Sequence, residues 1–281
     1  MKLEFDYVIA GGGSAGCALA SRLCEDKSIT VCIVEAGGNG NNLFIKMPAG
    51  NGFVFGNPKL DWGYKSIPQK NLNNRTIYFP RGKSLGGSSI VNGMIYMRGI
   101  PSDYDSWRQL GLNGWGYSDI LPYFKKSEGS EHRNDKYHGN KGPLKIERSS
   151  NYGILEEAFI KSAVKAGHKS IDDFNGSERT GVSRLDSTVS NGVRQSSAIS
   201  YLKKKPDNLT ILTHQQISKL LINKTDVIGL ETLKGTKVYC KREVIICQGA
   251  FGTPHLLMLS GIGPADHLIE NDINPIIDLP G

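Results

Sequence analysis

A glycine-rich loop between two apolar segments constrains the fold of this chain more than any other feature. Residues 5–10 form a short, mostly apolar run, which is typical of a buried parallel strand. Residues 14–23 have the small and apolar side chains of a helix that packs on a sheet. The G-x-G-x-x-G spacing begins between these two segments, so the region predicts a strand, a tight turn and a helix in succession.

Each glycine of the loop has a separate physical task. Gly11 permits the tight turn, Gly13 lets the backbone approach a pyrophosphate, and Gly16 allows close contact between helix and strand. Ser14 and Ala15 begin the helix, where backbone N–H groups without a helical partner can donate to an anion. The loop therefore predicts a dinucleotide diphosphate at the N-terminus of this helix.

An acid follows at the position where a ribose would lie. Residues 30–35 form a second apolar strand that ends in Glu35, about 20 residues after the loop, where a carboxylate can accept both ribose hydroxyls. A G-x-G-x-x-G match alone can be an ordinary loop, but the ordered strand, loop, helix, strand and acid favour a dinucleotide site. Ala36 and the two glycines after it let the chain turn away beside an adenosine, which mildly favours FAD over NAD.

Two further segments have the small residues that a bound cofactor needs. Gly86, Gly87 and Ser88 offer free N–H groups and little bulk, which suits a nest for phosphate or for the electron-rich edge of a flavin. Taken alone, this segment would more often be a surface loop. Residues 244–250 predict a strand beneath the cofactor, in which Gly249 and Ala250 stay small for close approach.

Longer motifs carry a resemblance to a known family. Residues 82–105 and 249–263 resemble the two signature motifs of the glucose-methanol-choline (GMC) flavin oxidoreductases. The similarity covers the whole chain and is strongest to the choline or alcohol dehydrogenase branch. Shorter matches lie at residues 61–64, 103–107, 114–124, 138–143 and 191–194.

The resemblance implies how the cofactor is held. In the family, the residues matching Gly86, Gly87, Asn92, Gly93 and Met94 wrap the diphosphate and the isoalloxazine ring. An NAD-dependent enzyme would not need this second motif, so the resemblance favours FAD.

Three single positions refine that picture. Some family members attach flavin covalently through a histidine at the position of Val91, which cannot form that bond, so FAD is expected to bind non-covalently. Ile217 matches an apolar residue whose backbone meets the adenine, although it could also be an ordinary strand residue. Asp186 replaces a common glutamine, which leaves any polar role at that position in doubt.

We expect an α/β fold with a discontinuous domain plan. Residues 1–145 and 200–281 would form an incomplete, Rossmann-like FAD-binding domain, and residues 146–199 would form part of a second, substrate-binding domain. A helix is expected over residues 156–167, which have helical spacing and end in glycine.

The sequence assigns no catalytic residue. Alcohol oxidation needs a base for the hydroxyl proton, and the family's catalytic histidine lies near the C-terminus of a chain roughly twice as long. Each of the six histidines here is expected to be a solvated or capping side chain, and no catalytic triad or metal-ligand spacing occurs. They are His132, His138, His168, His214, His255 and His267.

Two interpretations follow for the chain as a whole. The first is an FAD-binding portion that is inactive alone. The alternative is an active alcohol or choline dehydrogenase whose second half comes from another chain or lies outside this sequence. In either case a small alcohol is a substrate only when the second half is present.

Composition excludes some other classes of protein. The net charge of +7 comes from scattered basic residues without a nucleic-acid motif, which indicates a solvated surface. No apolar run is long enough for a membrane span, and the first strand begins close to Met1, so we expect a soluble, intracellular protein. The five cysteines lack paired spacing and are expected to be reduced.

Overall fold

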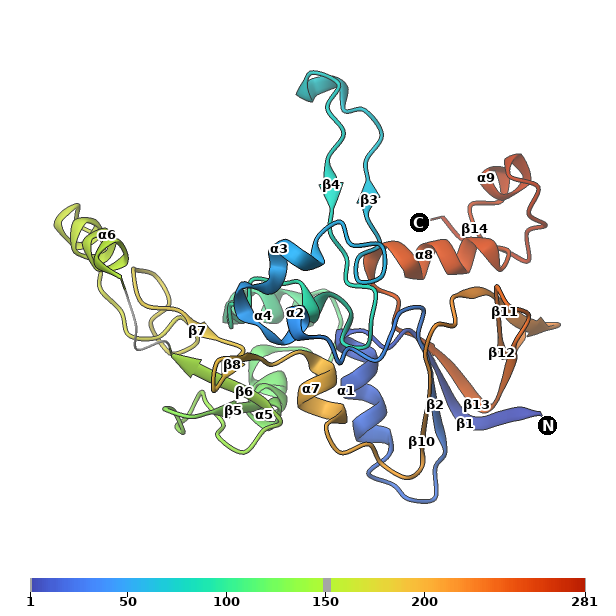
Figure 1. The fold of residues 1–281 in the computed structure, drawn as a ribbon, viewed down its shortest axis with the longest axis horizontal. Coiled ribbons are helices and arrows are strands. Elements are labelled where there is room, and N and C mark those ends of the chain that lie inside the picture. The colour runs from blue at the N-terminus through green and yellow to red at the C-terminus, as the bar shows by residue number, and fades with distance from the viewer. Residues whose placement is uncertain (1, 149–152, 281) are drawn as a thin grey trace. The chain divides into compact units, whose positions relative to one another are not determined.

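The computed structural model describes residues 2–148 and 153–280 (Figure 1). Contacts divide the chain into two units. The first combines Met1–Val91 with Ser196–Gly281, and the second is Asn92–Gln195. The expected boundaries were 145/146 and 199/200, so the second unit begins earlier in the chain than the expected one. The physical reason is that the Tyr96 N–H donates to the Asp186 carbonyl at 2.8 Å, which joins this earlier segment to the second unit. In the same unit, helix α5 (Tyr117–Ser127) contacts strand β5 (Glu128–Ser130), which pairs with β6 (Leu144–Arg148).

The first unit is built on a six-stranded sheet with the order β10-β2-β1-β13-β12-β11. Strands β10, β2, β1 and β13 run parallel, whereas β12 and β11 are antiparallel to their neighbours. This arrangement confirms the expected Rossmann-like α/β class. The strands are β1 (Leu3–Ala10), β2 (Val31–Val34), β10 (Leu209–Leu212), β11 (Ile217–Asn223), β12 (Asp226–Thr232) and β13 (Lys237–Ile246).

The register of the parallel strands brings their carboxyl ends to one edge. Ala10 of β1 pairs with both Val34 of β2 and Ile246 of β13. The residues that follow these three strands, Gly11, Glu35 and Cys247, therefore leave the sheet at the same edge. Ligands of open α/β sheets bind outside this edge, where loops and helix N-termini gather.

Helices cover both faces of the sheet. Helix α8 (Gly249–Leu259) contributes Leu256 to one apolar cluster, which includes Val8 and Val34. Helix α1 (Ser14–Leu23) contributes Ala20 to a second cluster. That second cluster includes Ile9 and Ile33, because successive side chains of a strand point to opposite faces. Helix α7 (Ser197–Leu202) contacts α1.

Shorter elements complete the first unit. Strands β3 (Tyr64–Lys65) and β4 (Tyr78–Phe79) form an antiparallel pair, and β14 (Ile262–Gly263) pairs with β15 (Ile277–Asp278). The short helices are α2 (Leu43–Lys46), α3 (Asn51–Val54) and α9 (Ala265–Glu270), with 3₁₀ turns at Pro48–Gly50, Lys70–Leu72 and Gly87–Ile90.

The second unit contains three helices among its described residues. They are α4 (Pro101–Gln109), α5 and α6 (Ile154–Lys165). The expected helix over residues 156–167 is confirmed with an earlier start. Gly167, with φ of +94°, lies just beyond its end in the left-handed conformation that glycine adopts readily. Small strands β7 (Asp186–Ser187), β8 (Val189–Ser190) and β9 (Val193–Arg194) complete the unit.

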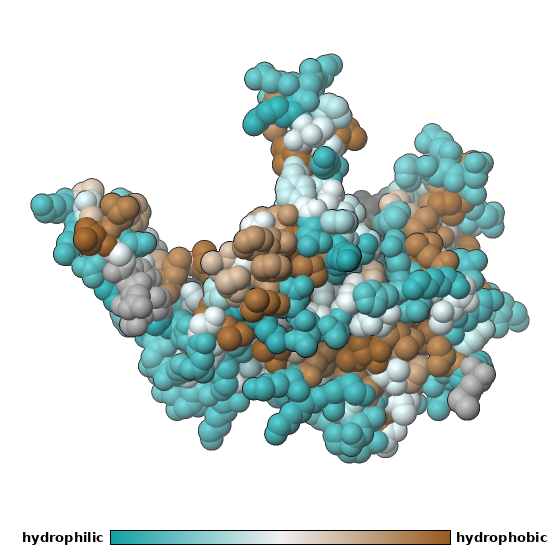
Figure 2. Space-filling model, viewed as in Figure 1, coloured by the Kyte–Doolittle hydropathy of each residue, from teal (hydrophilic) through white to brown (hydrophobic). Residues whose placement is uncertain are grey.

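Helix α6 exposes large apolar side chains. Leu155 is 81% exposed and Phe159 is 70% exposed, and brown atoms mark this helix in Figure 2.

The helices in the described ranges include none whose length and apolar character would suit a bilayer crossing.

A buried ionic cluster stabilises the second unit. His138 is fully buried, and its Nδ1 and Nε2 atoms lie 2.7 Å from Glu128 Oε1 and 2.8 Å from Asp173 Oδ2. Arg98 donates to the other oxygen of Glu128. The expectation of a solvated or capping role for His138 is therefore wrong, because tertiary packing encloses the imidazole between two carboxylates.

Candidate functional site

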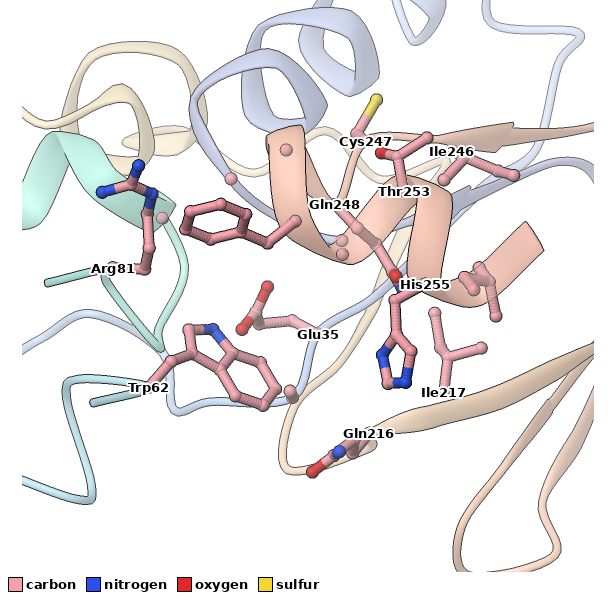
Figure 3. Close-up of a pocket in the computed structure, with 18 of the residues that line it drawn as sticks. Glu35, Trp62, Arg81, Gln216, Ile217, Ile246, Cys247, Gln248, Thr253 and His255 are labelled. Carbon is pink, nitrogen blue, oxygen red and sulfur yellow. The ribbon is translucent and has the colours of Figure 1, made fainter. Parts of the chain in front are cut away.

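A cavity of about 880 Å³ lies in the first unit, at the edge of the sheet where β1, β2 and β13 end (Figure 3). Its volume is in the upper part of the range of about 300 to 1,000 Å³ for ligand pockets. Among the predicted site residues, those that line it are Gly11, Gly13, Ser14, Ala15, Glu35, Ala36, Gly87, Ser88, Ile217, Gly249 and Ala250.

The glycines of the first loop are required by close packing. A Cβ atom on Gly11 would lie 2.8 Å from the carbonyl oxygen of Cys247, and Gly11 has φ of +100°. A Cβ atom on Gly16 would lie 2.1 Å from the carbonyl oxygen of Gly11, so Gly16 packs behind the loop and does not line the cavity. At Gly13 the closest atom would be 3.7 Å away, so a ligand can approach this part of the backbone.

The N-terminus of α1 is available for an anion. Its N-cap residue, Gly13, makes no side-chain capping hydrogen bond, and the first turn contains no acidic residue. Ser14 and Ala15 line the cavity at this point. Their N–H groups have no partner within the helix, and they lie at the positive end of its dipole.

Glu35 connects the end of β2 to the glycine loop. Its Oε2 accepts the Gly12 N–H at 2.9 Å, and its Oε1 accepts the Gly37 N–H at 2.7 Å. Burial raises the pKa of Glu35, and the backbone N–H groups of Gly37 and Gly12 act in the opposite direction. A carboxylate has about four lone-pair sites, and the backbone N–H groups of Gly12, Gly37 and Ala36 do not use all of them, so acceptor capacity remains for a hydroxyl donor of a ligand.

The second glycine segment packs directly on the first. The N–H of Gly86, which has φ of +97°, donates to the Gly12 carbonyl at 2.8 Å. A Cβ atom on Gly87 would lie 2.6 Å from the Cα of Gly13. Gly87 and Ser88 line the cavity, whereas Gly86 supports them from behind. The two motifs thus form one continuous wall of backbone.

The expectation for Gly249 and Ala250 was wrong in one respect. Strand β13 ends at Ile246, and both residues lie in the first turn of α8. Gly249 has φ of +73°, so the chain turns sharply after Gln248 instead of continuing as a strand. Both residues nevertheless line the cavity, as does Ile217, the first residue of β11.

The remaining predicted positions belong to the second unit. Asn92 and Met94 contact one another through the Met94 N–H and Asn92 Oδ1 at 3.2 Å, and Gly93 lies between them in sequence. Their contact with a cofactor stays a prediction. Asp186 is buried and accepts a hydrogen bond from Arg148 Nε at 2.8 Å, so its carboxylate contacts β6 within the second unit.

Sequence reasoning missed several residues of the cavity wall. Trp62 and Tyr64 stack with ring centroids 5.9 Å apart, and Tyr64 meets the edge of Phe251 at 5.5 Å. The Arg81 guanidinium lies 4.9 Å from the centroid of Phe251. His255 also lines the cavity, and it is exposed, as expected for a solvated histidine on a helix. Residues 61–64 match the family, but no local signal indicated where these side chains point.

Comparisons with known proteins agree with this geometry. A family model described as GMC oxidoreductase matches residues 5–277. An oxygen-dependent choline dehydrogenase from Rhizobium etli is 43% identical over 99% of this chain and 52% of its own length. A second such enzyme, from Sinorhizobium fredii, is 42% identical over the same shares.

Solved structures give the same result. Pyridoxine 4-oxidase from Mesorbium loti matches with a TM-score of 0.93 and 35% identity, over 98% of this chain and 55% of that one. An FAD-dependent oxidoreductase from Chaetomium thermophilum matches with a TM-score of 0.90 and 32% identity, over 98% and 51%. The chain spans about half the length of the curated relatives it matches. Since the family model matches nearly all of its residues, the chain belongs to the GMC oxidoreductase family.

Proposed function

We propose that the cavity binds FAD non-covalently and that the chain is the cofactor-binding portion of an oxidoreductase acting on CH–OH groups. The observation that carries the proposal is the meeting of two glycine segments, the uncapped N-terminus of α1 and Glu35 around one cavity. When bound, FAD would supply the acceptor for a hydride, which carries the two electrons of the oxidation.

The residues present fit this cofactor. The open backbone at Gly13 and the N–H groups of Ser14 and Ala15 would hold the diphosphate. Glu35 has acceptor sites left for the ribose hydroxyls. The wall formed by Gly87 and Ser88 would exclude water from one side of the cofactor. Asn92, Gly93 and Met94 remain our proposed contacts for the flavin end.

The relatives support the choice of substrate class. The curated relatives are choline dehydrogenases, and one solved neighbour is FAD-dependent. We therefore propose a small alcohol, with choline as the first candidate, as the donor for the complete reaction. The first unit would hold the diphosphate and ribose of the cofactor, and residues 146–199 would contribute to the substrate side.

Non-covalent attachment rests on Val91. This residue is 6% exposed, and its aliphatic side chain has no atom that can form a bond to the flavin. A protein that holds FAD only by hydrogen bonds and packing releases it when the fold is lost.

A pair of titrations tests the proposal. Purified apo-protein is titrated with FAD and, separately, with NAD while ligand or protein fluorescence is followed. We expect FAD to bind at least tenfold more tightly than NAD, and acid precipitation of the loaded protein to leave the flavin in the supernatant. Tighter binding of NAD, or yellow precipitated protein, would contradict the proposal.

A further inference from the structure

His255 lies on the face of α8 that lines the cavity. Gly252, His255, Leu256 and Leu259 all line it, and their spacing of three, four and seven residues is that of one helix face. Figure 3 shows the imidazole directed from α8 toward Gln216 and Ile217 on the opposite wall. The position of the His255 imidazole is therefore set by the packing of α8 on the sheet.

This part of the cavity adjoins the residue proposed to bind ribose. The Gln215 N–H donates to the carbonyl oxygen of Glu35 at 2.9 Å, so residues 215–217 run directly beside the end of β2. The diphosphate would lie at the N-terminus of α1, on the side of Glu35 away from residues 215–217. A nucleotide that places its phosphates at α1 and its ribose at Glu35 would thus place its base between Ile217 and His255.

The chemistry of this compartment suits a planar aromatic base. Ile217, Leu233 and Leu259 give it apolar walls, and His255 supplies the aromatic ring. Two other polar side chains are engaged: Gln215 accepts from Thr232 Oγ1 at 3.2 Å, and Ser218 donates to the Glu231 carbonyl at 3.0 Å. Within residues 2–148 and 153–280, the structure gives the His255 imidazole no hydrogen-bond partner. Its ring face and both nitrogens are available to a ligand.

We infer that His255 recognises the adenine base and sets the preference of the site for an adenine nucleotide. The inference rests on the proposed binding of FAD and adds the side chain that reads its base. Any base can stack on an aromatic side chain. A purine gains more from this contact than a pyrimidine, because its ring surface is larger. His255 is a binding residue here and takes no part in proton transfer.

The experiment compares nucleotides that differ only in the base. ADP and UDP carry the same ribose and diphosphate, so the ratio of their affinities isolates the contribution of the base. The affinities of ADP and UDP are measured by displacement of FAD from wild-type protein and from three variants. The variants are His255→Ala, His255→Phe and His267→Ala. His267 is the matched control, because it is an exposed histidine on α9 that does not line the cavity.

The expected loss follows from the cost of removing an aromatic partner. In His255→Ala the affinities for FAD and ADP should fall by about five- to hundredfold, and the ADP-to-UDP ratio should fall at least fivefold. His255→Phe should retain affinity within about threefold of wild type if stacking dominates. His267→Ala should match wild type in every measurement. Melting curves of the apo-proteins check that each variant is folded.

Two results would overturn the inference. One is an unchanged ADP affinity in His255→Ala, and the other is an equal loss for ADP and UDP. Failure of the proposed function gives a different result, because wild-type protein itself would then not bind FAD.

Discussion

The Glu35 carboxylate accepts the backbone N–H of Gly12 at 2.9 Å, so the acid that ends β2 holds the loop that follows β1. The contact depends on the parallel register that pairs Ala10 with Val34, since this register brings the two strand ends side by side. Glu35 therefore has two tasks, because it fixes the shape of the loop and also faces the cavity.

Replacing Glu35 by glutamine should weaken FAD binding. Glu35→Gln removes a charge, and a charge-assisted hydrogen bond contributes about 1.5 to 3 kcal/mol, which corresponds to roughly ten- to hundredfold in affinity. Calorimetric titration measures this change. Glu25→Gln is the control, because Glu25 pairs with Arg22 on the exposed surface. An unchanged dissociation constant for Glu35→Gln would leave this acid with the structural task alone.

Gly16→Ala should destabilise the first unit. The added Cβ atom would lie 2.1 Å from a backbone oxygen, so the strand, the helix or the loop must shift. Overpacking of this kind costs about 1 to 3 kcal/mol of unfolding free energy. Gly52→Ala in α3 is the control, because nothing lies within 4 Å of its added Cβ atom. Urea denaturation should separate the two variants, and equal midpoints would contradict the packing argument.

The His138 cluster predicts a dependence of stability on pH. Burial by itself lowers the pKa of His138, but the hydrogen bonds to Asp173 and Glu128 outweigh it and raise the pKa to about 9. The folded value is thus above the unfolded value of about 6.5. The stabilisation is then fully present below about pH 6.5 and is lost as the pH rises through about 9, with a size on the order of 3 kcal/mol.

Two measurements check the His138 prediction. The ring signals of His138 in NMR should titrate near pH 9, and urea unfolding should show lower stability at pH 9.5 than at pH 7. Assignment of the signal uses His138→Gln. Titration near pH 6.5 would show that the cluster does not retain the proton. At the acidic end, burial raises the pKa of Asp173, but His138 lowers it to about 2, so this contribution is lost as the pH falls through about 2.

Alcohols should not reduce FAD bound to residues 1–281 at enzymatic rates. The resemblance places the family's catalytic histidine outside these residues, and a positioned base typically supplies about 10² to 10⁴ in rate. The measurement is anaerobic bleaching of bound flavin by primary alcohols, including choline. Dithionite serves as the positive control for reducible flavin. Rapid bleaching by any alcohol would show that a base lies within the chain.

The sequence by itself determined the parts of the site that depend on local backbone geometry. The turn at Gly11, the close contact at Gly16 and the acid at the end of β2 follow from short-range constraints, so their spacing could be recognised in the chain. The resemblance to the family motifs added Gly87 and Ser88 to the predicted site.

Only the tertiary structure decided which other side chains reach the cavity. Trp62 is far in sequence from Phe251 and His255 on α8, and the face of α8 that meets the cavity is set by its packing on the sheet. The burial of His138 between Glu128 and Asp173 has the same origin. A local pattern specifies the backbone of a strand or helix, but the direction of each side chain depends on long-range packing, which a pattern of a few residues does not contain.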